Sequence, residues 1–295
     1  MSDRSWTLLL HGGARTISPK QAAASRRGCL AAAWVGQRVL HGGGAALDAV
    51  EAIVRELEDD TTFNAGRGSV LNAAGEVEMD AAIMDGATLD IGGVAAIRDV
   101  RHPVSVARSL LREIPVLLAG EGASRFAGQI GAERALPHPF ADKDTNEDDP
   151  ACDTVGCIAV DSAGHIAAAT STGGLTGKRP GRVGDACLPG GGFYADDQLG
   201  ATAFSGDGES IARTILAATV MQALETVAPS VAAQRAIERL ERSGGEAGVI
   251  VIDRQGRIGI AHNSRHFAVA VAGSWLDQPR SALQAEEFEG LMDHD

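Results

Sequence analysis

The sequence predicts an α+β fold in which antiparallel sheets are covered by helices. Two observations support this class. Segments with the apolar composition of strands come in pairs joined by short turns, as at 154–160 and 166–170 around Asp161-Ser162-Ala163-Gly164. The helical segments are gathered in blocks and do not alternate with single strands, an order that favours antiparallel sheets over a βαβ arrangement.

The first half begins with a strand at 6–10, which we expect to end at His11-Gly12-Gly13-Ala14. Two helices follow at 19–40 and 45–57, and in the second the apolar residues recur every three to four positions, as on a buried helix face. Residues 64–68 form a loop. The remaining predicted elements are strands at 77–84 and 94–97 and helices at 104–111 and 122–131.

The second half contributes a long loop, further strands and two helices. The loop runs from Thr172 to Tyr194 and is rich in glycine. The predicted elements after it are strands at 201–205, 248–252, 258–261 and 267–271 and helices at 209–224 and 231–240. We expect the acidic tail, 286–295, to be frayed and peripheral. Because both halves supply strands to a common core, we expect residues 1–295 to form a single domain.

Composition argues against several classes of function. The formal net charge of −13 leaves no basic surface to neutralise the phosphates of a nucleic acid. The four cysteines lack the paired spacing of a zinc site or of a disulfide framework. The apolar run before His11 is too short for a signal peptide or a membrane-spanning helix, so we expect a cytoplasmic protein that does not contact membranes.

The most informative residue is Thr154, which stands where an acidic segment changes abruptly into an apolar strand. Residues 139–150 carry five acids, one base and two prolines, a composition that cannot bury enough apolar area to fold. A cut before Thr154 would give it a free α-amine with a pKa of about 7.7–8.0, a base beside its own hydroxyl. This context predicts a proenzyme that cleaves itself between Asp153 and Thr154; the alternative is an ordinary solvated loop at 137–153.

Three later segments are dense in glycine and small polar residues. Thr170-Ser171-Thr172-Gly173-Gly174 ends a strand and can present hydroxyl and N–H groups, unless it is only a capped turn. Arg182 and Asp185 lie three residues apart and could hold the carboxylate and the ammonium of an α-amino acid; the alternative is a surface ion pair. Ser205 and the N–H of Gly206 could form an oxyanion hole, unless the segment merely caps the next helix.

Together these segments resemble the plant-type L-asparaginase/isoaspartyl peptidase family of N-terminal-nucleophile hydrolases. The motifs that carry the resemblance occur in the family's order and span most of the chain: 11–14, 63–70, 79–86, 154–156, 170–174, 181–185 and 206–209. The resemblance implies a four-layer αββα sandwich with two antiparallel sheets. It also implies autoproteolysis into an α chain, 1–153, and a β chain, 154–295.

The same resemblance implies roles for individual residues. Thr154 would be the nucleophile, supported by Thr172 and oriented by Asn64. The other groups implied in catalysis and substrate binding are Ser205 and Gly206 at the oxyanion, and Arg182, Asp185, Gly206 and Gly208 around the substrate. No catalytic cofactor is implied. A structural sodium ion would lie on the backbone carbonyls of Leu57, Glu58, Asp60, Phe63, Ala65 and Arg67.

The implied reaction is hydrolysis of the side-chain amide of L-asparagine, or of β-aspartyl dipeptides, by a homodimer of αβ units. Three features depart from the family pattern, one of which is a short, acidic linker before the nucleophile. Asp153 replaces the usual glycine before the nucleophile, as in glycosylasparaginases, and Ser205 replaces the usual threonine. A glycosylasparaginase-like amidase is therefore one alternative. A non-catalytic amino-acid-binding protein that remains one chain is another, and a phosphate-binding protein built on the glycine loops is disfavoured by the net charge.

Overall fold

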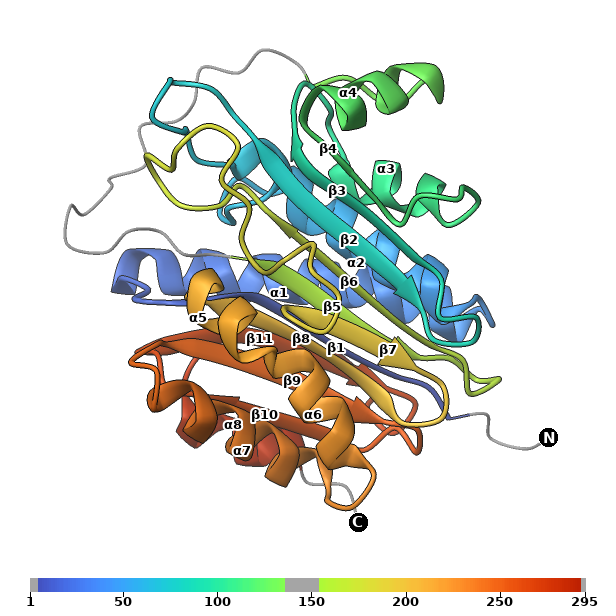
Figure 1. Ribbon diagram of the computed structural model, residues 1–295. Coiled ribbons are helices and arrows are strands. Elements are labelled where there is room, and N and C mark those ends of the chain that lie inside the picture. Colours follow the sequence, from blue (N-terminus) through green and yellow to red (C-terminus); the bar gives the residue numbers. More distant parts are fainter. Residues whose placement is uncertain (1–4, 136–153, 293–295) are drawn as a thin grey trace.

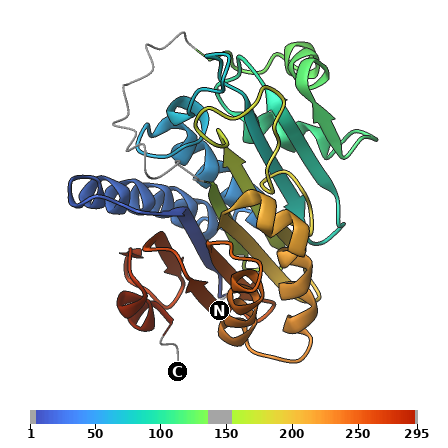
Figure 2. The same ribbon diagram turned by 60° about the vertical axis from the view of Figure 1, so that its left-hand side comes forward.

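Two β-sheets packed face to face, with helices on their outer sides, make up the fold (Figures 1 and 2). The computed structural model describes residues 5–135 and 154–292. The strands are β1 (Thr7–Arg15), β2 (Met79–Asp85), β3 (Ile91–Ile97), β4 (Leu117–Ala119), β5 (Val155–Val160), β6 (Ile166–Thr172), β7 (Phe193–Asp196), β8 (Gly200–Gly206), β9 (Ala247–Asp253), β10 (Ile258–His262), β11 (His266–Gly273) and β12 (Arg280–Ala282). The helices are α1 (Pro19–His41), α2 (Ala46–Asp59), η1 (Gly66–Gly68, a 3-10 turn), α3 (Pro103–Leu110), α4 (Gly120–Gln129), α5 (Gly208–Thr214), α6 (Leu216–Leu224), α7 (Pro229–Glu241) and α8 (Ala285–Met292).

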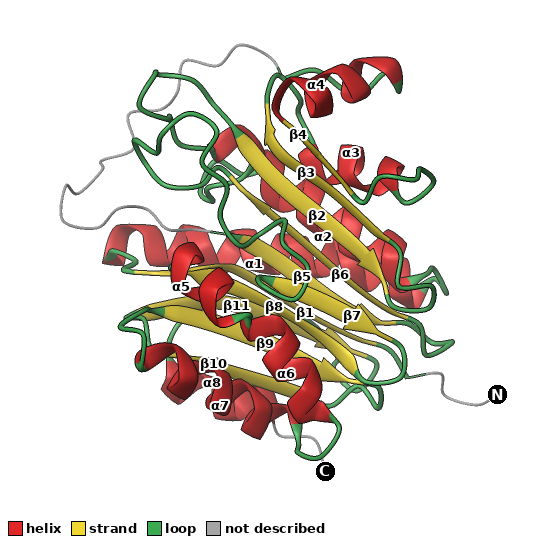
Figure 3. Ribbon diagram, viewed as in Figure 1, coloured by secondary structure: helices red, strands yellow, loops and turns green. Residues whose placement is uncertain are grey.

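The larger sheet has the order β12-β11-β1-β5-β6-β2-β3-β4, and the smaller has the order β10-β9-β8-β7. All neighbouring strands run antiparallel except β3 and β4, which are parallel. Strands from the two halves of the chain are interleaved, because β1 lies between β11 and β5 (Figure 3). The expected α+β fold with two sheets is confirmed.

Alternation of side chains along single strands produces the layers. On β1, Leu8 and Leu10 join Ile53 of α2 in the core between the large sheet and its helices. Leu9, which points to the opposite face, joins the core between the two sheets. Ile250 of β9 lies in that same inter-sheet core. Its neighbours Val249 and Val251 pack in the third core, which α6 and α7 cover. Helix, sheet, sheet and helix therefore follow one another as the four-layer sandwich requires.

The first strand is longer than we expected. We predicted that it would end at His11, but β1 continues to Arg15 and keeps its pairing with β11. The register shifts between His11 and Gly13, which is the signature of a bulge. The glycines here bend the strand and do not end it, so that part of the prediction was wrong.

The helix expected at 209–224 is divided in two. Ile215 adopts a left-handed conformation, with φ 51° and ψ 54°, and separates α5 from α6. The apolar spacing continues across this break, so the sequence pattern gave no sign of it. The first turn of α5 directly follows β8 and lies beside the long loop that precedes β7, where the candidate site is found.

The acidic tail also differs from the prediction. Residues 285–292 form α8, in which Phe288 and Leu291 are buried against the inter-sheet core. The expectation of a frayed, peripheral tail was therefore wrong over these residues, and 293–295 lie outside the described part. Three short strands, β4, β7 and β12, were not predicted, and β7 begins inside the segment expected to be a loop up to Tyr194. None of the helices among the described residues is both long and apolar enough to cross a membrane.

Candidate active site

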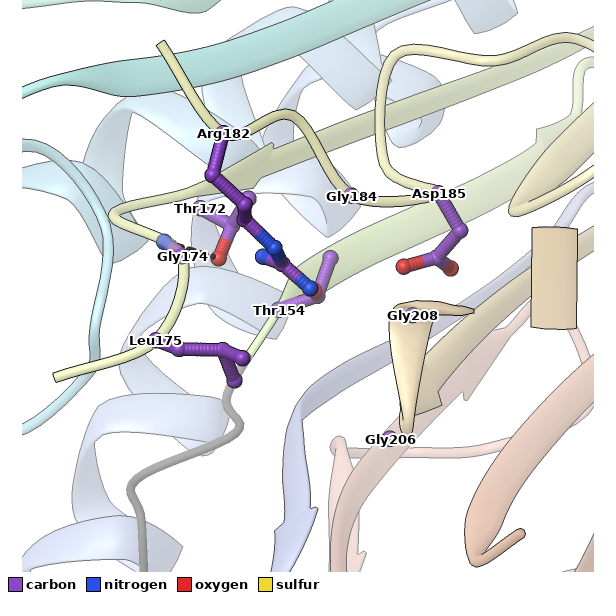
Figure 4. A pocket seen from close by; sticks show the side chains of 9 residues that line it. All are labelled: Thr154, Thr172, Gly174, Leu175, Arg182, Gly184, Asp185, Gly206 and Gly208. Carbon is purple, nitrogen blue, oxygen red and sulfur yellow. Dashed lines mark hydrogen bonds between the residues drawn. The ribbon is translucent and has the colours of Figure 1, made fainter. Parts of the chain in front are cut away.

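One pocket brings together the sequence segments singled out above. It opens where the end of β6, the start of β5 and the first turn of α5 meet the glycine-rich loop between β6 and β7 (Figure 4). The residues that line it are Thr154, Thr172, Gly174, Leu175, Arg182, Gly184, Asp185, Gly206 and Gly208. Of the predicted site residues, Asn64 and Ser205 are not among these lining residues, and Asp153 lies outside the described residues.

Thr154 is held at the start of β5 by a contact from the smaller sheet. Its side chain is buried, and its backbone N–H donates to Ser205 Oγ at 3.1 Å. Ser205 is fully buried on β8 and also accepts from the N–H of Ala14 on β1, at 3.1 Å. A serine hydroxyl has two acceptor lone pairs and one donor. With both lone pairs used, its O–H remains available to donate.

Thr172 lies beside Thr154 because β5 and β6 are antiparallel neighbours. Val155 pairs with Ser171, so Thr154 and Thr172 are the next positions at that end of the ladder. The Thr172 hydroxyl accepts from the N–H of Gly174 at 3.0 Å, which folds the chain back immediately after the strand. The two hydroxyl-bearing residues thus line the pocket from adjacent strands (Figure 4).

Asn64 forms hydrogen bonds to the turn at Gly173 and Gly174. Among the described residues, its side chain has no hydrogen bond to Thr154. Its Nδ2 donates to Gly174 O at 2.6 Å, and its Oδ1 accepts from Val70 N at 3.0 Å. Its carbonyl oxygen accepts from Gly173 N at 2.8 Å. A Cβ on Gly173 would lie 2.4 Å from Asn64 Oδ1, so only glycine permits this approach. Any influence of Asn64 on the nucleophile passes through residues 172–174.

Arg182 and Asp185 both lie on the pocket wall, as their spacing suggested, but they do not form an ion pair with each other. Arg182 pairs with Glu209 of α5 through Nε–Oε1 at 2.9 Å and Nη2–Oε2 at 2.6 Å. This pairing raises the pKa of Arg182 although burial acts to lower it, and it lowers the pKa of Glu209. The sequence motif contained Glu209, but nothing in it indicated this partner.

Asp185 is a buried carboxylate with an unused acceptor. It is only 3% exposed, and its Oδ2 has no hydrogen-bond partner among the described residues. Burial raises the pKa of Asp185 to about 7, against the lowering effects of a backbone N–H and of Arg182. A buried acid with an unsatisfied oxygen in a pocket indicates a site that a cationic ligand group would complete.

Two glycines keep the pocket open beside these charges. A Cβ on Gly208 would lie 2.8 Å from Asp185 Oδ1 and 3.2 Å from Arg182 Nη2. Gly206 has a φ of 149°, and a Cβ there would lie 2.2 Å from Glu246 O. Gly206 therefore cannot be replaced without strain, and a side chain at position 208 would crowd the two charged groups.

Further buried polar groups lie close to the pocket residues, and no role was expected for them from the sequence. Asp80 on β2 is fully buried; burial raises its pKa, while Lys178 and Arg182 act to lower it. Lys178 is 5% exposed and donates to Glu78 O at 2.8 Å. His11 is also fully buried, with its Nε2 at 2.4 Å from where a Cβ on Gly156 would stand. Burial lowers the pKa of His11 to about 3, so this imidazole is neutral.

The loop expected to hold sodium folds tightly after α2. Gly66 has a φ of 51°, and a Cβ there would lie 2.4 Å from Glu58 O. The carbonyls of Asp60 and Ala65 each accept one N–H, from Phe63 and Gly68, which leaves each a second lone pair. Oxygen ligands of this kind suit a hard cation. Over residues 5–135 and 154–292, no group of three His, Cys, Asp or Glu side chains is placed to hold a metal.

The fold and the pocket first define a class: a two-sheet α+β protein with a buried threonine at a strand start, facing an arginine and an acid. Comparison with known proteins specifies the family. The family model described as asparaginase matches residues 4–148 and 137–276, so the chain belongs to this family. Enzymes of the family act without a catalytic cofactor.

Curated relatives agree with this assignment. The chain is 42% identical over 267 residues to the isoaspartyl peptidase/L-asparaginase of Xenopus laevis, covering 84% of this chain and 86% of that protein. It is 41% identical over 285 residues to the one from Danio rerio, covering 90% and 91%. It is 38% identical over 300 residues to a probable isoaspartyl peptidase/L-asparaginase of Drosophila melanogaster, covering 88% and 90%.

Proposed function

We propose that this protein is a threonine hydrolase that cleaves the side-chain amide of L-asparagine and of β-aspartyl dipeptides, releasing L-aspartate. The observation that carries the proposal is the pocket itself, in which Thr154 shares a wall with Arg182 and with Asp185, whose Oδ2 has no partner among the described residues. The names of the curated relatives, isoaspartyl peptidase/L-asparaginase, support the same reaction.

The charged groups of the pocket match the α-carboxylate and the α-ammonium, which the two substrates have in common. The Arg182 guanidinium binds the α-carboxylate, and Asp185 accepts from the α-ammonium with its free Oδ2. This leaves the side-chain amide beside Thr154. Free asparagine and a β-aspartyl dipeptide differ only beyond that amide, so the same two contacts serve both.

The chemistry is a two-step acyl transfer. The Thr154 hydroxyl adds to the side-chain carbonyl carbon, and its proton passes to the threonine's own amine. The C–N bond then breaks, and ammonia or the peptide amine leaves with that proton. Water attacks the resulting β-aspartyl ester, which releases L-aspartate and restores the hydroxyl.

Ser205 and Gly206 stabilise the charge that develops on the carbonyl oxygen. The Ser205 O–H is available for this role because its lone pairs are taken by the N–H groups of Ala14 and Thr154. Thr172 supports the nucleophile from the adjacent strand. Asn64 holds the turn after Thr172 in place, through its bonds to Gly173 and Gly174.

The amine that acts as base exists only after cleavage between Asp153 and Thr154, which yields chains 1–153 and 154–295. This step, a sodium ion in the loop that starts at Leu57, and assembly of two αβ units remain parts of the proposal. The glycosylasparaginase alternative rests on Asp153 alone, and no contact among the described residues favours it.

The test combines mass spectrometry and turnover. The purified protein is incubated near neutral pH and its intact mass is followed, while β-aspartyl-leucine hydrolysis is assayed in parallel. We expect two fragments, one starting at Thr154, and activity that rises with cleavage. The Thr154→Ala variant should do neither. A Thr154→Ala protein that still hydrolyses the dipeptide would refute the proposal, and an uncut wild-type chain that binds L-aspartate without turnover would favour the amino-acid-binding alternative.

A further inference from the structure

Glu209 holds the guanidinium of Arg182 by one edge only. Nε and Nη2 donate to the two carboxylate oxygens of Glu209, the two-bond arrangement that fixes a guanidinium plane most firmly. A guanidinium carries five N–H donors, so three remain, two of them on Nη1. Among the described residues, these three have no hydrogen-bond partner.

The remaining edge faces the pocket. Arg182 extends toward Thr154, and Gly184 and Gly208 lie close beside the guanidinium (Figure 4). A Cβ on Gly184 would stand 3.0 Å from Nη1, and one on Gly208 would stand 3.2 Å from Nη2. The side chain is therefore confined by backbone at its pocket end and by Glu209 along its other edge.

Glu209 is itself held in place. It lies in the first turn of α5, where Asp207 caps the helix by accepting from Ser210 N. Arg213, one turn later, donates to the carbonyl oxygen of Glu209 at 3.3 Å. The carboxylate of Glu209 is nevertheless half-exposed, with 53% of its side chain accessible. An exposed pair contributes little to folding, so the arrangement is more easily explained by what it does for Arg182.

We propose that Glu209 is a positioning residue that orients Arg182 for the substrate's α-carboxylate, an inference that rests on the proposed function. The glutamate takes the side edge of the guanidinium and leaves the end edge, Nη1 and Nη2, to the substrate. It does not compete for the same donors. Its negative charge also repels the incoming carboxylate, but solvent screens that repulsion at a half-exposed group. Orientation outweighs repulsion, because a free arginine must lose its rotamer freedom on binding.

In the competing hypothesis, Glu209 weakens substrate binding, because it pairs with the Arg182 guanidinium until the substrate carboxylate displaces it. The two hypotheses predict opposite changes in KM. We expect Glu209→Ala to raise KM for β-aspartyl-leucine about tenfold while kcat changes less than about twofold, because the nucleophile is untouched. Glu209→Gln retains one acceptor and should fall between Glu209→Ala and the wild type. A lower KM in Glu209→Ala would overturn the proposal, as would an unchanged one.

A double-mutant cycle shows whether the effect passes through Arg182. In an Arg182→Ala background, Glu209→Ala should add almost nothing to KM, because there is no guanidinium left to orient. An equal effect in both backgrounds would contradict the proposal. Glu241→Gln, an exposed glutamate at the end of α7, is the matched control for loss of a surface charge. If the wild type does not hydrolyse β-aspartyl-leucine, the proposed function is wrong. If the wild type is active and the Glu209 variants have an unchanged KM, only this inference is wrong.

Discussion

Ser205 Oγ accepts hydrogen bonds from Thr154 N and from Ala14 N, each at 3.1 Å, and so connects the two sheets at the candidate nucleophile. The threonine nitrogen bound here is the one that would become the free amine after cleavage. A single hydroxyl thus contacts the nitrogen of the proposed base directly, and in the proposed mechanism it donates its own proton to the reacting carbonyl oxygen.

Ser205→Ala should therefore lower kcat by roughly 100-fold to 1000-fold, the usual effect of losing one oxyanion donor. It also leaves two buried N–H groups without an acceptor, which costs about 1–3 kcal/mol each. Ser205→Thr keeps the hydroxyl and is the matched control. Steady-state kinetics and thermal unfolding of both variants test this; a fully active Ser205→Ala would remove Ser205 from the mechanism.

Arg182→Lys should separate charge from geometry. Lysine keeps the positive charge but cannot present two parallel N–H donors, so we expect KM to rise roughly tenfold, and more than that for Arg182→Ala. The measurement is KM for L-asparagine and for β-aspartyl-leucine, which share the α-carboxylate and should be affected alike. An effect confined to one substrate would place Arg182 at the leaving group instead.

Binding of L-aspartate should depend on pH through Asp185, whose pKa burial raises to about 7. The substrate ammonium requires the ionised carboxylate, so affinity should increase as pH rises from 6 to 8 and level off above the pKa. Below it, affinity should fall by up to about tenfold per pH unit. The other charged groups that act on Asp185 are Arg182, Glu209 and Asp80.

Titration calorimetry on the mature protein checks this dependence, and proton release on binding near pH 7 would identify the group that ionises. Asp185→Asn should bind weakly and show a flat profile over the same range. A wild-type affinity that does not change between pH 6 and 8 would mean that Asp185 does not receive the ammonium.

Asn64→Ala should impair both stability and turnover. It removes the acceptor for Val70 N and the donor to Gly174 O, both buried, at a cost of about 1–3 kcal/mol for each group left unsatisfied. It also frees the turn that follows Thr172, so kcat should fall more than KM changes. Asn72→Ala is the control: Asn72 is likewise buried and bonds to a loop, through Ala74 N and Glu76 N, but does not line the pocket.

Phe288→Ala tests the packing of the C-terminal helix. Phe288 is 3% exposed and its ring lies 5.3 Å from His262 and 6.4 Å from Phe267, centroid to centroid. Removing a buried aromatic ring costs about 3–5 kcal/mol. Denaturant unfolding should show this loss, whereas exposed Glu289→Ala should change little. Equal stabilities would mean that α8 does not pack as described.

The sequence singled out several residues that the fold brings into one pocket, but it did not indicate the partners that hold them there. Arg182 and Asp185 were identified because they lie three residues apart in a loop. Glu209, 27 residues from Arg182, was not assigned as its partner, since no local pattern encodes a contact made by folding. The two acceptor bonds of Ser205 were missed for the same reason, although its hydroxyl was singled out.

Errors in the fold have similar physical causes. The glycines after His11 indicate a turn when read alone, but pairing with β11 keeps them in the strand. Ile215 sits within an uninterrupted helical pattern, and only tertiary packing places it in a left-handed conformation. In the tail, the high acidic content concealed Phe288 and Leu291, whose spacing of three residues puts both on one helix face.

The position of β1 between β11 and β5 dictates an order of events in the cell. Neither half can complete the large sheet alone, since each would expose bare strand edges of the kind that drive aggregation. Ala14, Thr154 and Ser205 meet only when both halves are assembled. If the bond before Thr154 is cut, folding must come first, and two fragments synthesised separately should assemble poorly compared with the chain made in one piece.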